Sequence, residues 1–363
     1  DIQSSAITDI ASVVRSTKEA IRMASSEAGR QPTQLVLGIA GEFVKGATST
    51  LTYPREEAQS KINLAELRNI VHKLEWRAFA EVRKSLGEET GFPEIDIKLI
   101  ESSIVDVRID KYRVSNPLGF QGKEVEMSIF NAFAPLGHYG ALQNIAQDLE
   151  LELLGIISEP FALSRCVESE EGLSAIFVDV GGSSTDVAVV SNGAVQGNKM
   201  FGIGGRTFTR RLSVELNISF EEAERLKFAY SEDRLEQKSK KIIGDIVNDD
   251  MEVWLEGLVL LLSEFKLDQL PPKIILCGGG TYLPEFKATL NSTKWHKRLP
   301  FIRTPQATHL LPKEIQSIVD ETKKVRDRED IVPLALVIEG IKLSGDETIV
   351  QKVLRKVISI MKV

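Results

Sequence analysis

Two glycine-rich turns hold the residues of this chain whose types and spacing could do chemistry. In the first, Asp179 ends an apolar run and is followed by two glycines and then by hydroxyl side chains. Backbone N–H groups can approach a ligand closely at glycines, so the turn predicts a phosphate-binding nest. Asp179 would hold Mg²⁺ through water, since this ion keeps most of its hydration shell. The predicted phosphate-binding residues are Gly181, Gly182, Ser183, Ser184 and Thr185.

The second turn follows the apolar run 273–277 and consists of Gly278, Gly279 and Gly280. A glycine loop between a strand and a helix lets a nucleobase and ribose lie against bare backbone. Each turn also has a plain alternative. The first could be a hairpin whose small residues serve only the turn, and a lone glycine triplet is common where a strand meets a helix. Their occurrence in one chain favours a nucleotide site.

Composition limits the class of protein. The chain has 363 residues and is 42% hydrophobic, enough to bury two cores. A formal charge of −7 and a pI near 5.4 argue against a nucleic-acid partner. Two distant cysteines and four scattered histidines form neither a metal-binding spacing nor a disulfide framework. No run approaches the roughly 20 apolar residues of a membrane span.

Hydrophobic periodicity predicts the elements that position the two turns. The first part of the chain should form a helix over 7–28 ending at Gly29, a buried strand at 34–39, an α+β segment at 42–135 with a long helix over 64–86, a helix over 139–149 and a strand at 153–157. The second part should form strands at 176–180, 186–190 and 273–277, a tight hairpin at Asn192-Gly193 and helices over 219–266.

These motifs resemble those of the superfamily of actin and hexokinase. Residues 179–186 are similar to its second phosphate motif, and residues 276–283, ending on Leu283, to its adenosine motif. Within the superfamily the chain resembles the bacterial cell-division protein FtsA. The run 201–205 precedes a helix as in that family, and Asn-Pro-Leu-Gly-Phe-Gln-Gly at 116–122 is similar to a run in the FtsA insertion.

The resemblance implies ATP and Mg²⁺ as cofactors and assigns further site residues. Gly205, Glu224 and Lys227 would contact the nucleoside, and Glu159 would orient the attacking water. Glu224 and Lys227 share one helical face, and a surface ion pair worth a few tenths of a kcal/mol is the alternative. For Glu159, which precedes Pro160, the alternative is an acid stabilised by a helix dipole.

Two departures from the family pattern bear on function. FtsA begins with a strand, an aspartate-containing glycine turn and further strands, so we expect a preceding piece of roughly 40–60 residues that carries the first phosphate loop. Without that loop the chain would be a weak ATPase at most. In addition, residues 228–270 predict helices alone, where FtsA has strands in the subdomain that meets its polymer partner.

Residues 349–363 predict an amphipathic helix with four basic residues, Lys352, Arg355, Lys356 and Lys362. Such a helix could lie in an anionic membrane surface, where each basic residue adds about 1 kcal/mol. It could also pack on the second domain, as most amphipathic helices do in globular proteins. The membrane-facing set would be Val350, Val353, Leu354, Arg355, Lys356, Val357, Ile358 and Met361.

The predicted fold is α/β: an actin-like (ribonuclease H-like) two-domain ATPase fold with an FtsA-type α+β insertion and nucleotide between the domains. The expected parts are a first domain at 1–41 and 136–172, the insertion at 42–135, a second domain at 173–212 and 271–345, a helical subdomain at 213–270 and a terminal helix at 346–363.

The predicted function is that of an FtsA-like cell-division protein. It would bind ATP, self-associate and tether an FtsZ-like polymer to the inner membrane, on whose cytoplasmic face it would be peripheral. One alternative is a PilM-like scaffold of type IV pilus assembly, which needs no lipid-binding tail. The other is a sugar or acetate kinase of the same superfamily, against which the insertion argues.

Overall fold

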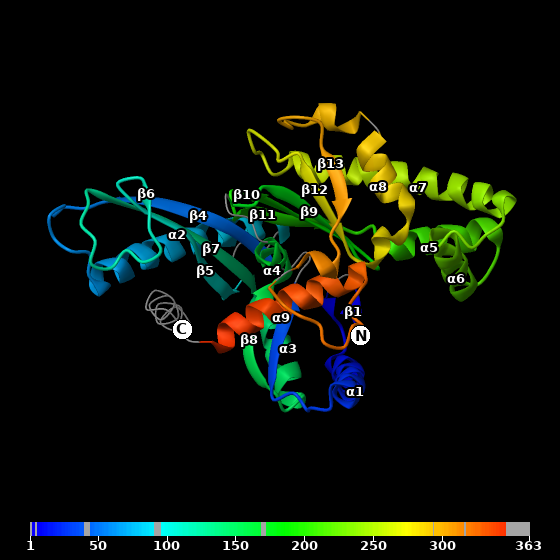
Figure 1. Cartoon of the computed structure of the whole chain (residues 1–363), viewed down its shortest axis with the longest axis horizontal. Coiled ribbons are helices and arrows are strands. Elements are labelled where there is room, and N and C mark those ends of the chain that lie inside the picture. The colour runs from blue at the N-terminus through cyan, green and yellow to red at the C-terminus, as the bar shows by residue number, and fades with distance from the viewer. Residues whose placement is uncertain are drawn as a thin grey trace. The chain divides into compact units, whose positions relative to one another are not determined.

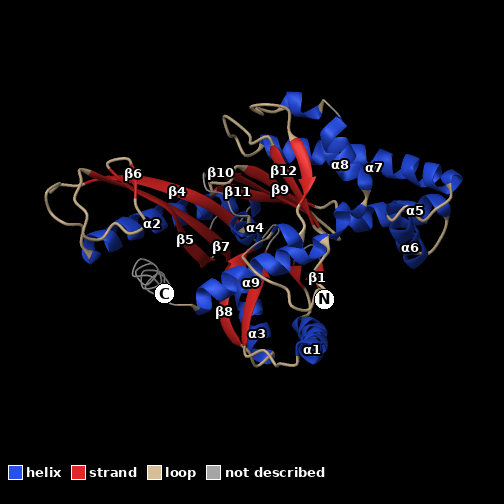
Figure 2. Cartoon of the chain, in the orientation of Figure 1, coloured by secondary structure: helices blue, strands red, loops and turns tan. Residues whose placement is uncertain are grey.

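The structure is a computed structural model that describes residues 2–3, 6–39, 44–90, 96–167, 172–292, 294–315 and 317–345. The predicted membrane helix at 346–363 lies outside the described residues. Contacts within the chain define two compact units: unit 1 comprises 1–162, 193–197 and 336–363, and unit 2 comprises 163–192 and 198–335. Figure 1 traces the order of the elements and Figure 2 separates helices from strands.

Unit 1 contains both predicted strands, β3 (Gln34–Ile39) and β8 (Glu152–Ser158), which pair as a two-stranded parallel sheet. Helix α1 (Ile10–Ala28) is capped by Asp9 and ends at Gly29, whose φ of 65° is left-handed. The helix starts later than predicted because Ala6–Ile7 pairs as β2 with β1 (Ile2–Gln3). It packs on α3 (Leu136–Asp148).

Helix α9 (Ile331–Ser344) approaches this sheet closely. A Cβ at Gly340 would lie only 2.8 Å from Val36 Cγ2, and one at Gly155 would lie 3.1 Å from Leu343 Cδ1. Glycine is therefore required at position 340, because any larger residue would clash with the Val36 side chain of β3.

The α+β segment of unit 1 is a four-stranded antiparallel sheet in the order β4 (Lys45–Pro54), β7 (Glu124–Pro135), β5 (Ile97–Ile109) and β6 (Tyr112–Arg113). Helix α2 (Leu64–Thr90) covers one face, and Leu67, Leu74 and Met127 are fully buried between the two layers. The buried Arg55 guanidinium joins a loop to the helix, since it pairs with Glu66 at 2.7 Å and donates to Gly122 O at 2.9 Å. The predicted α+β segment is thus present, long helix included.

Unit 2 is built on a five-stranded mixed sheet in the order β11 (Ala194–Phe201), β10 (Thr185–Ser191), β9 (Ala175–Val180), β12 (Lys273–Cys277) and β13 (Gln306–His309). β9 is antiparallel to β10 and parallel to β12, so the turn after β9 and the loop after β12 emerge at the same sheet edge. The predicted hairpin is present, with positive φ at both Asn192 (51°) and Gly193 (78°).

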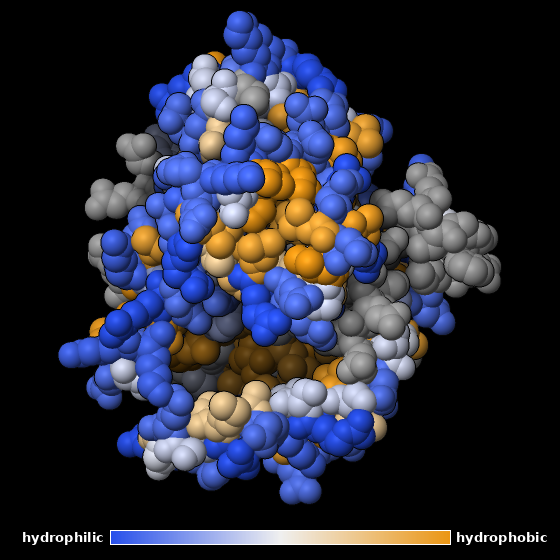
Figure 3. Space-filling model, turned by 90° about the vertical axis from the view of Figure 1, so that its right-hand side faces the viewer, coloured by the Kyte–Doolittle hydropathy of each residue, from blue (hydrophilic) through white to orange (hydrophobic). Residues whose placement is uncertain are grey.

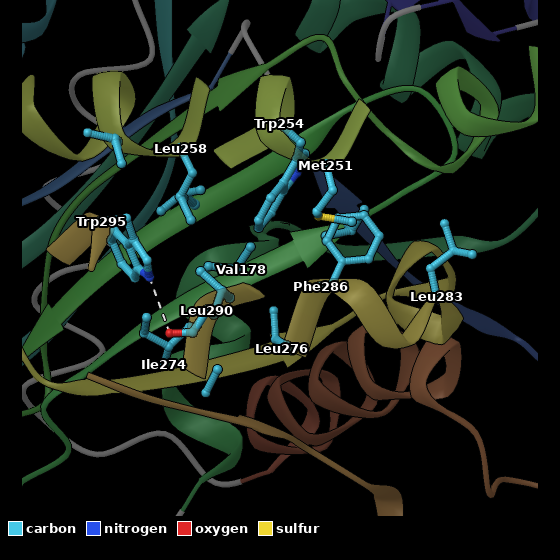
Figure 4. Close-up of a cluster of buried hydrophobic side chains, with 14 of the residues drawn as sticks. Val178, Met251, Trp254, Leu258, Ile274, Leu276, Leu283, Phe286, Leu290 and Trp295 are labelled. Carbon is cyan, nitrogen blue, oxygen red and sulfur yellow. Dashed lines mark hydrogen bonds between the residues drawn. The ribbon is translucent and has the colours of Figure 1, made fainter. Parts of the chain in front are cut away.

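Four helices accompany this sheet: α5 (Gly205–Leu216), α6 (Phe220–Ser231), α7 (Gln237–Ser263) and α8 (Pro284–Ser292). Figure 4 shows Met251, Trp254 and Leu258 of α7 pointing toward Val178 of β9 and Phe286 of α8. The Trp254 and Phe286 rings meet edge to face at 4.7 Å between centroids. The described residues between α6 and β12 contain no strand, as predicted.

Surface polarity is uneven. Figure 3 shows an apolar patch bordered by hydrophilic side chains. Large exposed apolar residues of the unit 2 helices are Val214, Phe220, Phe228, Ile242, Val253 and Leu260. Along the described ranges, every helix is too short or too polar to cross a bilayer.

Candidate nucleotide site

The turn between β9 and β10 leaves bare backbone at the surface. Gly181 N donates to Ser184 O at 2.9 Å and closes the turn. Gly182 and Ser183 are exposed, and a Cβ on Gly182 would meet nothing nearer than the Arg206 side chain at 3.9 Å. This open backbone is what an anion-binding turn needs.

Two of the predicted phosphate-binding residues are buried. Ser184 Oγ donates to Asp186 Oδ2 at 3.3 Å. Thr185 Oγ1 donates to Ile203 O at 2.7 Å and accepts from Trp254 Nε1 at 2.9 Å. Both hydroxyls therefore hold the turn to the sheet, and the predicted residues with exposed surface are Gly182 and Ser183, with Gly181 half-buried.

Asp179 and Asp186 lie directly opposite each other on β9 and β10. Side chains opposite each other in an antiparallel pair share one face of the sheet, where like charges repel. Burial, together with the charge of the neighbouring Asp186 carboxylate, raises the pKa of Asp179 to about 7. A cation would relieve both effects. Asp186 is not among the site residues predicted from the sequence. Its place at the start of the strand that follows the turn, opposite Asp179, could have revealed it.

This carboxylate pair fits a Mg²⁺ ion that keeps part of its water shell. It does not form a metal site whose ligands all come from the protein. Among the residues that the structure describes, no three His, Cys, Asp or Glu side chains gather as metal ligands. Mg²⁺ is usually held by one or two carboxylates together with waters and phosphate oxygens. The two aspartates beside an open phosphate-type turn fit that requirement.

Helix α5 begins on the first turn. Gly205 N donates to Gly181 O at 2.9 Å, and Arg206 N donates to Gly182 O at 2.8 Å. A Cβ at Gly204 would lie 2.7 Å from Gly181 O, so only glycine permits this approach. The first amides of the helix thus fix the turn and bring the exposed Arg206 beside it.

The second glycine loop packs on the first turn. A Cβ at Gly278, where φ is 83°, would lie 2.1 Å from Asp179 Oδ1, and one at Gly280 would lie 2.4 Å from Val180 Cγ1. At Gly279 the nearest atom is Glu329 Cβ at 4.0 Å. Two of the three glycines are therefore needed for packing, and Gly279 alone presents open backbone. Leu283, also predicted to contact nucleotide, is buried in the core.

Lys227 and Glu224 lie beside the start of α5, whose first residue, Gly205, is close to both glycine segments. The Lys227 ammonium, with 8% of the residue exposed, donates to Gly205 O at 3.1 Å, Thr209 Oγ1 at 2.8 Å and Glu224 Oε2 at 2.8 Å. A Cβ at Gly205 would lie 3.5 Å from Gly280 Cα. The i,i+3 ion pair of the alternative is present, but Lys227 is buried and holds the start of α5; contact with a nucleoside stays a prediction.

Glu159 belongs to unit 1, whereas the two glycine turns belong to unit 2. It begins α4 (Glu159–Cys166), directly after β8. A Cβ on Gly38 would lie 2.8 Å from its Oε1, so the carboxylate lies over bare backbone of β3. Its role toward an attacking water stays a prediction.

Arg328 and Tyr282 lie beside the second glycine loop. The Arg328 guanidinium lies 5.1 Å from the centre of the Tyr282 ring and donates to Thr281 O. Burial lowers the pKa of Arg328, and burial together with the Glu329 carboxylate raises the pKa of Tyr282. Tyr282 follows the glycine triplet in sequence. No sequence signal marked Arg328, which tertiary contact alone brings here.

This fold, with its paired glycine turns at one sheet edge, defines the class of protein: an α/β chain of the actin-like (ribonuclease H-like) ATPase fold, as predicted. A solved structure described as a PilM-PilN type IV pilus biogenesis complex aligns with a TM-score of 0.61 over 94% of this chain and 88% of that chain. Their 16% sequence identity makes this a likeness of fold.

Sequence comparison narrows the class to one family. Residues 176–359 match the family model described as "Cell division protein FtsA", and the chain belongs to the FtsA family. FtsA of Neisseria meningitidis serogroup B is 25% identical over 230 residues, which are 62% of this chain and 51% of that protein. FtsA of Bacillus subtilis is 24% identical over 311 residues, which are 78% and 66% of the respective chains. The chain thus spans about half to two thirds of the length of these curated relatives.

Proposed function

We propose that this protein binds ATP with Mg²⁺ in unit 2 and that the nucleotide governs its self-association. The observation that carries the proposal is the meeting of open backbone at Gly182 and Gly279 with the Asp179–Asp186 pair. Bare amides and paired carboxylates at one sheet edge are what a phosphate chain and its divalent cation need.

Each residue has a role in this proposal. Gly182 and Ser183 bind phosphate oxygens, and the carboxylate of Asp179, with that of Asp186, orients the water shell of the metal. Glu224 offers its part-exposed carboxylate to the ribose hydroxyls, and Lys227 holds that carboxylate in place. Bound Mg²⁺–ATP supplies the transferable phosphoryl group. Glu159 would orient water for slow hydrolysis at most.

Membership of the FtsA family supports a role in cell division, in which the protein links an FtsZ-like polymer to the membrane. The tail at 346–363 would be the membrane contact, because its basic residues suit an anionic surface. The protein would then be cytoplasmic and peripheral on the inner face of the cell membrane.

The nucleotide site is tested with Asp179→Ala in the full chain. We expect affinity for Mg²⁺–ATP, measured with a fluorescent analogue, to fall roughly tenfold or more, and ATP-dependent sedimentation of assemblies to disappear. Asp268→Ala, which changes an exposed loop acid of the same unit, is the control. Unchanged ATP binding and assembly by Asp179→Ala would contradict the site.

The membrane role is tested by co-sedimentation with anionic vesicles, comparing the full chain with one that ends at Gly345. Loss of binding on truncation would support the anchor. Equal behaviour of the two forms would favour the other candidate, a pilus-type scaffold. The likeness of fold to the solved PilM-PilN complex is what makes that candidate worth testing.

A further inference from the structure

Helix α7 leaves an apolar groove on the surface of unit 2. The groove has a volume of about 690 Å³ and lies between α7, the end of β11 and the end of a 3₁₀ turn at Trp295–Arg298. Its apolar lining includes Phe201, Ile203, Val253, Leu260 and Leu299.

Large apolar side chains of the groove are exposed to solvent. Leu260 is 65% exposed and Val253 is 59% exposed. They are seven residues apart, hence on one face of the helix. Gly257 lies between them, and a Cβ there would come 3.1 Å from Phe201 Cε2, so the Phe201 ring forms part of the groove beside bare helix backbone. A contiguous apolar surface of this kind marks a place where another chain segment binds.

Helix α7, which forms one side of the groove, is acidic. From Ile242 to Phe265 the sequence has six carboxylates and neither lysine nor arginine. Three are paired: Glu256 with Arg298 at 2.6 Å, Glu264 with Lys199 at 3.0 Å and Asp250 with Arg211 at 4.0 Å. Helical spacing puts Asp249 and Glu252 on the same side as Glu256, along the edge of the groove. The occupant should therefore be apolar on one face and basic beside it.

The tail of this chain has that chemistry. Residues 348–363 contain four basic residues and no acidic one, and their apolar residues recur at helical spacing. As a helix, the 18 residues from 346 to 363 would be about 27 Å long, against about 22 Å for the groove face of α7 from Asp249 to Ser263.

We propose that the groove binds residues 346–363 of this chain as a helix. The stripe that includes Val353, Leu354 and Val357 covers Val253 and Leu260, and the basic side chains face the carboxylates along the groove edge. The same apolar stripe cannot contact the groove and a lipid surface together. Docking therefore competes with membrane binding. The docking itself is independent of the proposed membrane anchor, whereas the competition rests on it.

Amide hydrogen exchange of the full chain, measured without lipid, tests the docking. We expect the tail amides to exchange roughly tenfold faster in Leu260→Glu than in the wild type, because the groove can no longer cover the apolar stripe. Val253→Glu should act alike. The matched control is Val214→Glu, which changes a 71%-exposed residue of α5 outside the groove and should leave tail exchange unchanged.

Two outcomes would overturn the docking. One is equal tail exchange in the wild type and both groove variants. The other is a mass change from dimer to monomer in Leu260→Glu with unchanged tail exchange, which would make the groove an interface between copies. Vesicle binding is measured separately. If docking holds, Leu260→Glu should bind anionic vesicles more tightly than the wild type, and tail protection without vesicle binding would refute only the membrane anchor.

Discussion

Replacing Glu75 by glutamine should remove much of the pH dependence of stability in the inserted sheet of unit 1. Glu75 lies on α2 with none of its surface exposed. One carboxylate oxygen accepts from Ser102 Oγ at 3.2 Å, and the other has no partner among the described residues. Asn131, opposite Ser102 in the sheet, is also buried without side-chain partners there. Burial raises the pKa of Glu75 from 4.5 to about 7, although the Ser102 hydrogen bond opposes this shift.

The magnitude follows from proton linkage. The folded state binds the Glu75 proton more tightly than the unfolded state, so the stability from this group is complete below pH 4.5 and is lost as pH rises to about 7. The whole shift corresponds to about 3 kcal/mol, of which about 1 is lost by pH 5 and nearly all by pH 8. Glutamine cannot ionise. The fall of roughly 2 kcal/mol between pH 5 and pH 8 should therefore be absent from Glu75→Gln.

Hydrogen exchange of the α2 and β7 amides, corrected for the intrinsic pH dependence of exchange, reports the free energy of opening of this sheet. It should be measured at pH 5 and pH 8 in the wild type and in Glu75→Gln. Glu81→Gln is the control, because Glu81 forms an exposed pair with Arg77 on the same helix. If the free energy of opening falls as much between pH 5 and pH 8 in Glu75→Gln as in the wild type, the reasoning is refuted.

Three further predictions use unfolding free energies; each changes a residue of unit 2, and Gly119 of unit 1 serves as the comparison for the first. Gly278→Ala should lower the unfolding free energy by more than about 3 kcal/mol, since the new Cβ would clash with Asp179. Gly119→Ala, at a similar φ but with open space around it, should lower it by only about 1 kcal/mol. Equal losses in the two variants would show that the clash has no effect. Thr185→Val should cost about 2–3 kcal/mol because two buried hydrogen bonds are lost, and Thr185→Ser should restore most of this. Lys227→Met should cost about 2–4 kcal/mol, and a cost of a few tenths would mean a surface-type ion pair after all.

Most elements could be predicted from the sequence because their signals are local. The buried strands β3, β9 and β12 appear as short apolar runs, and Gly29 and Asn192-Gly193 mark a helix end and a hairpin by their backbone preferences. The start of α1 was predicted too early because the apolar Ile7 fits the helical period, yet it pairs in a short strand.

The site could be predicted only in outline. Both glycine turns, Asp179 and the Glu224–Lys227 spacing are visible in sequence, and so is the likeness to FtsA. Burial of Ser184 and Leu283 is not, because each depends on what packs against it from elsewhere in the chain. Arg328 had no signal for the same reason.

What the sequence determined by itself is where the backbone can turn or approach another group closely, and to which family the chain belongs. Only the tertiary structure decided which glycine does what: Gly204, Gly278 and Gly280 permit close packing, whereas Gly182 and Gly279 leave open backbone. It also decided that Lys227 holds a helix start and that Asp179 faces Asp186. The reason is physical: turn preference and hydrophobic period act between near neighbours, whereas burial, charge pairing and steric contact depend on residues far apart in the chain.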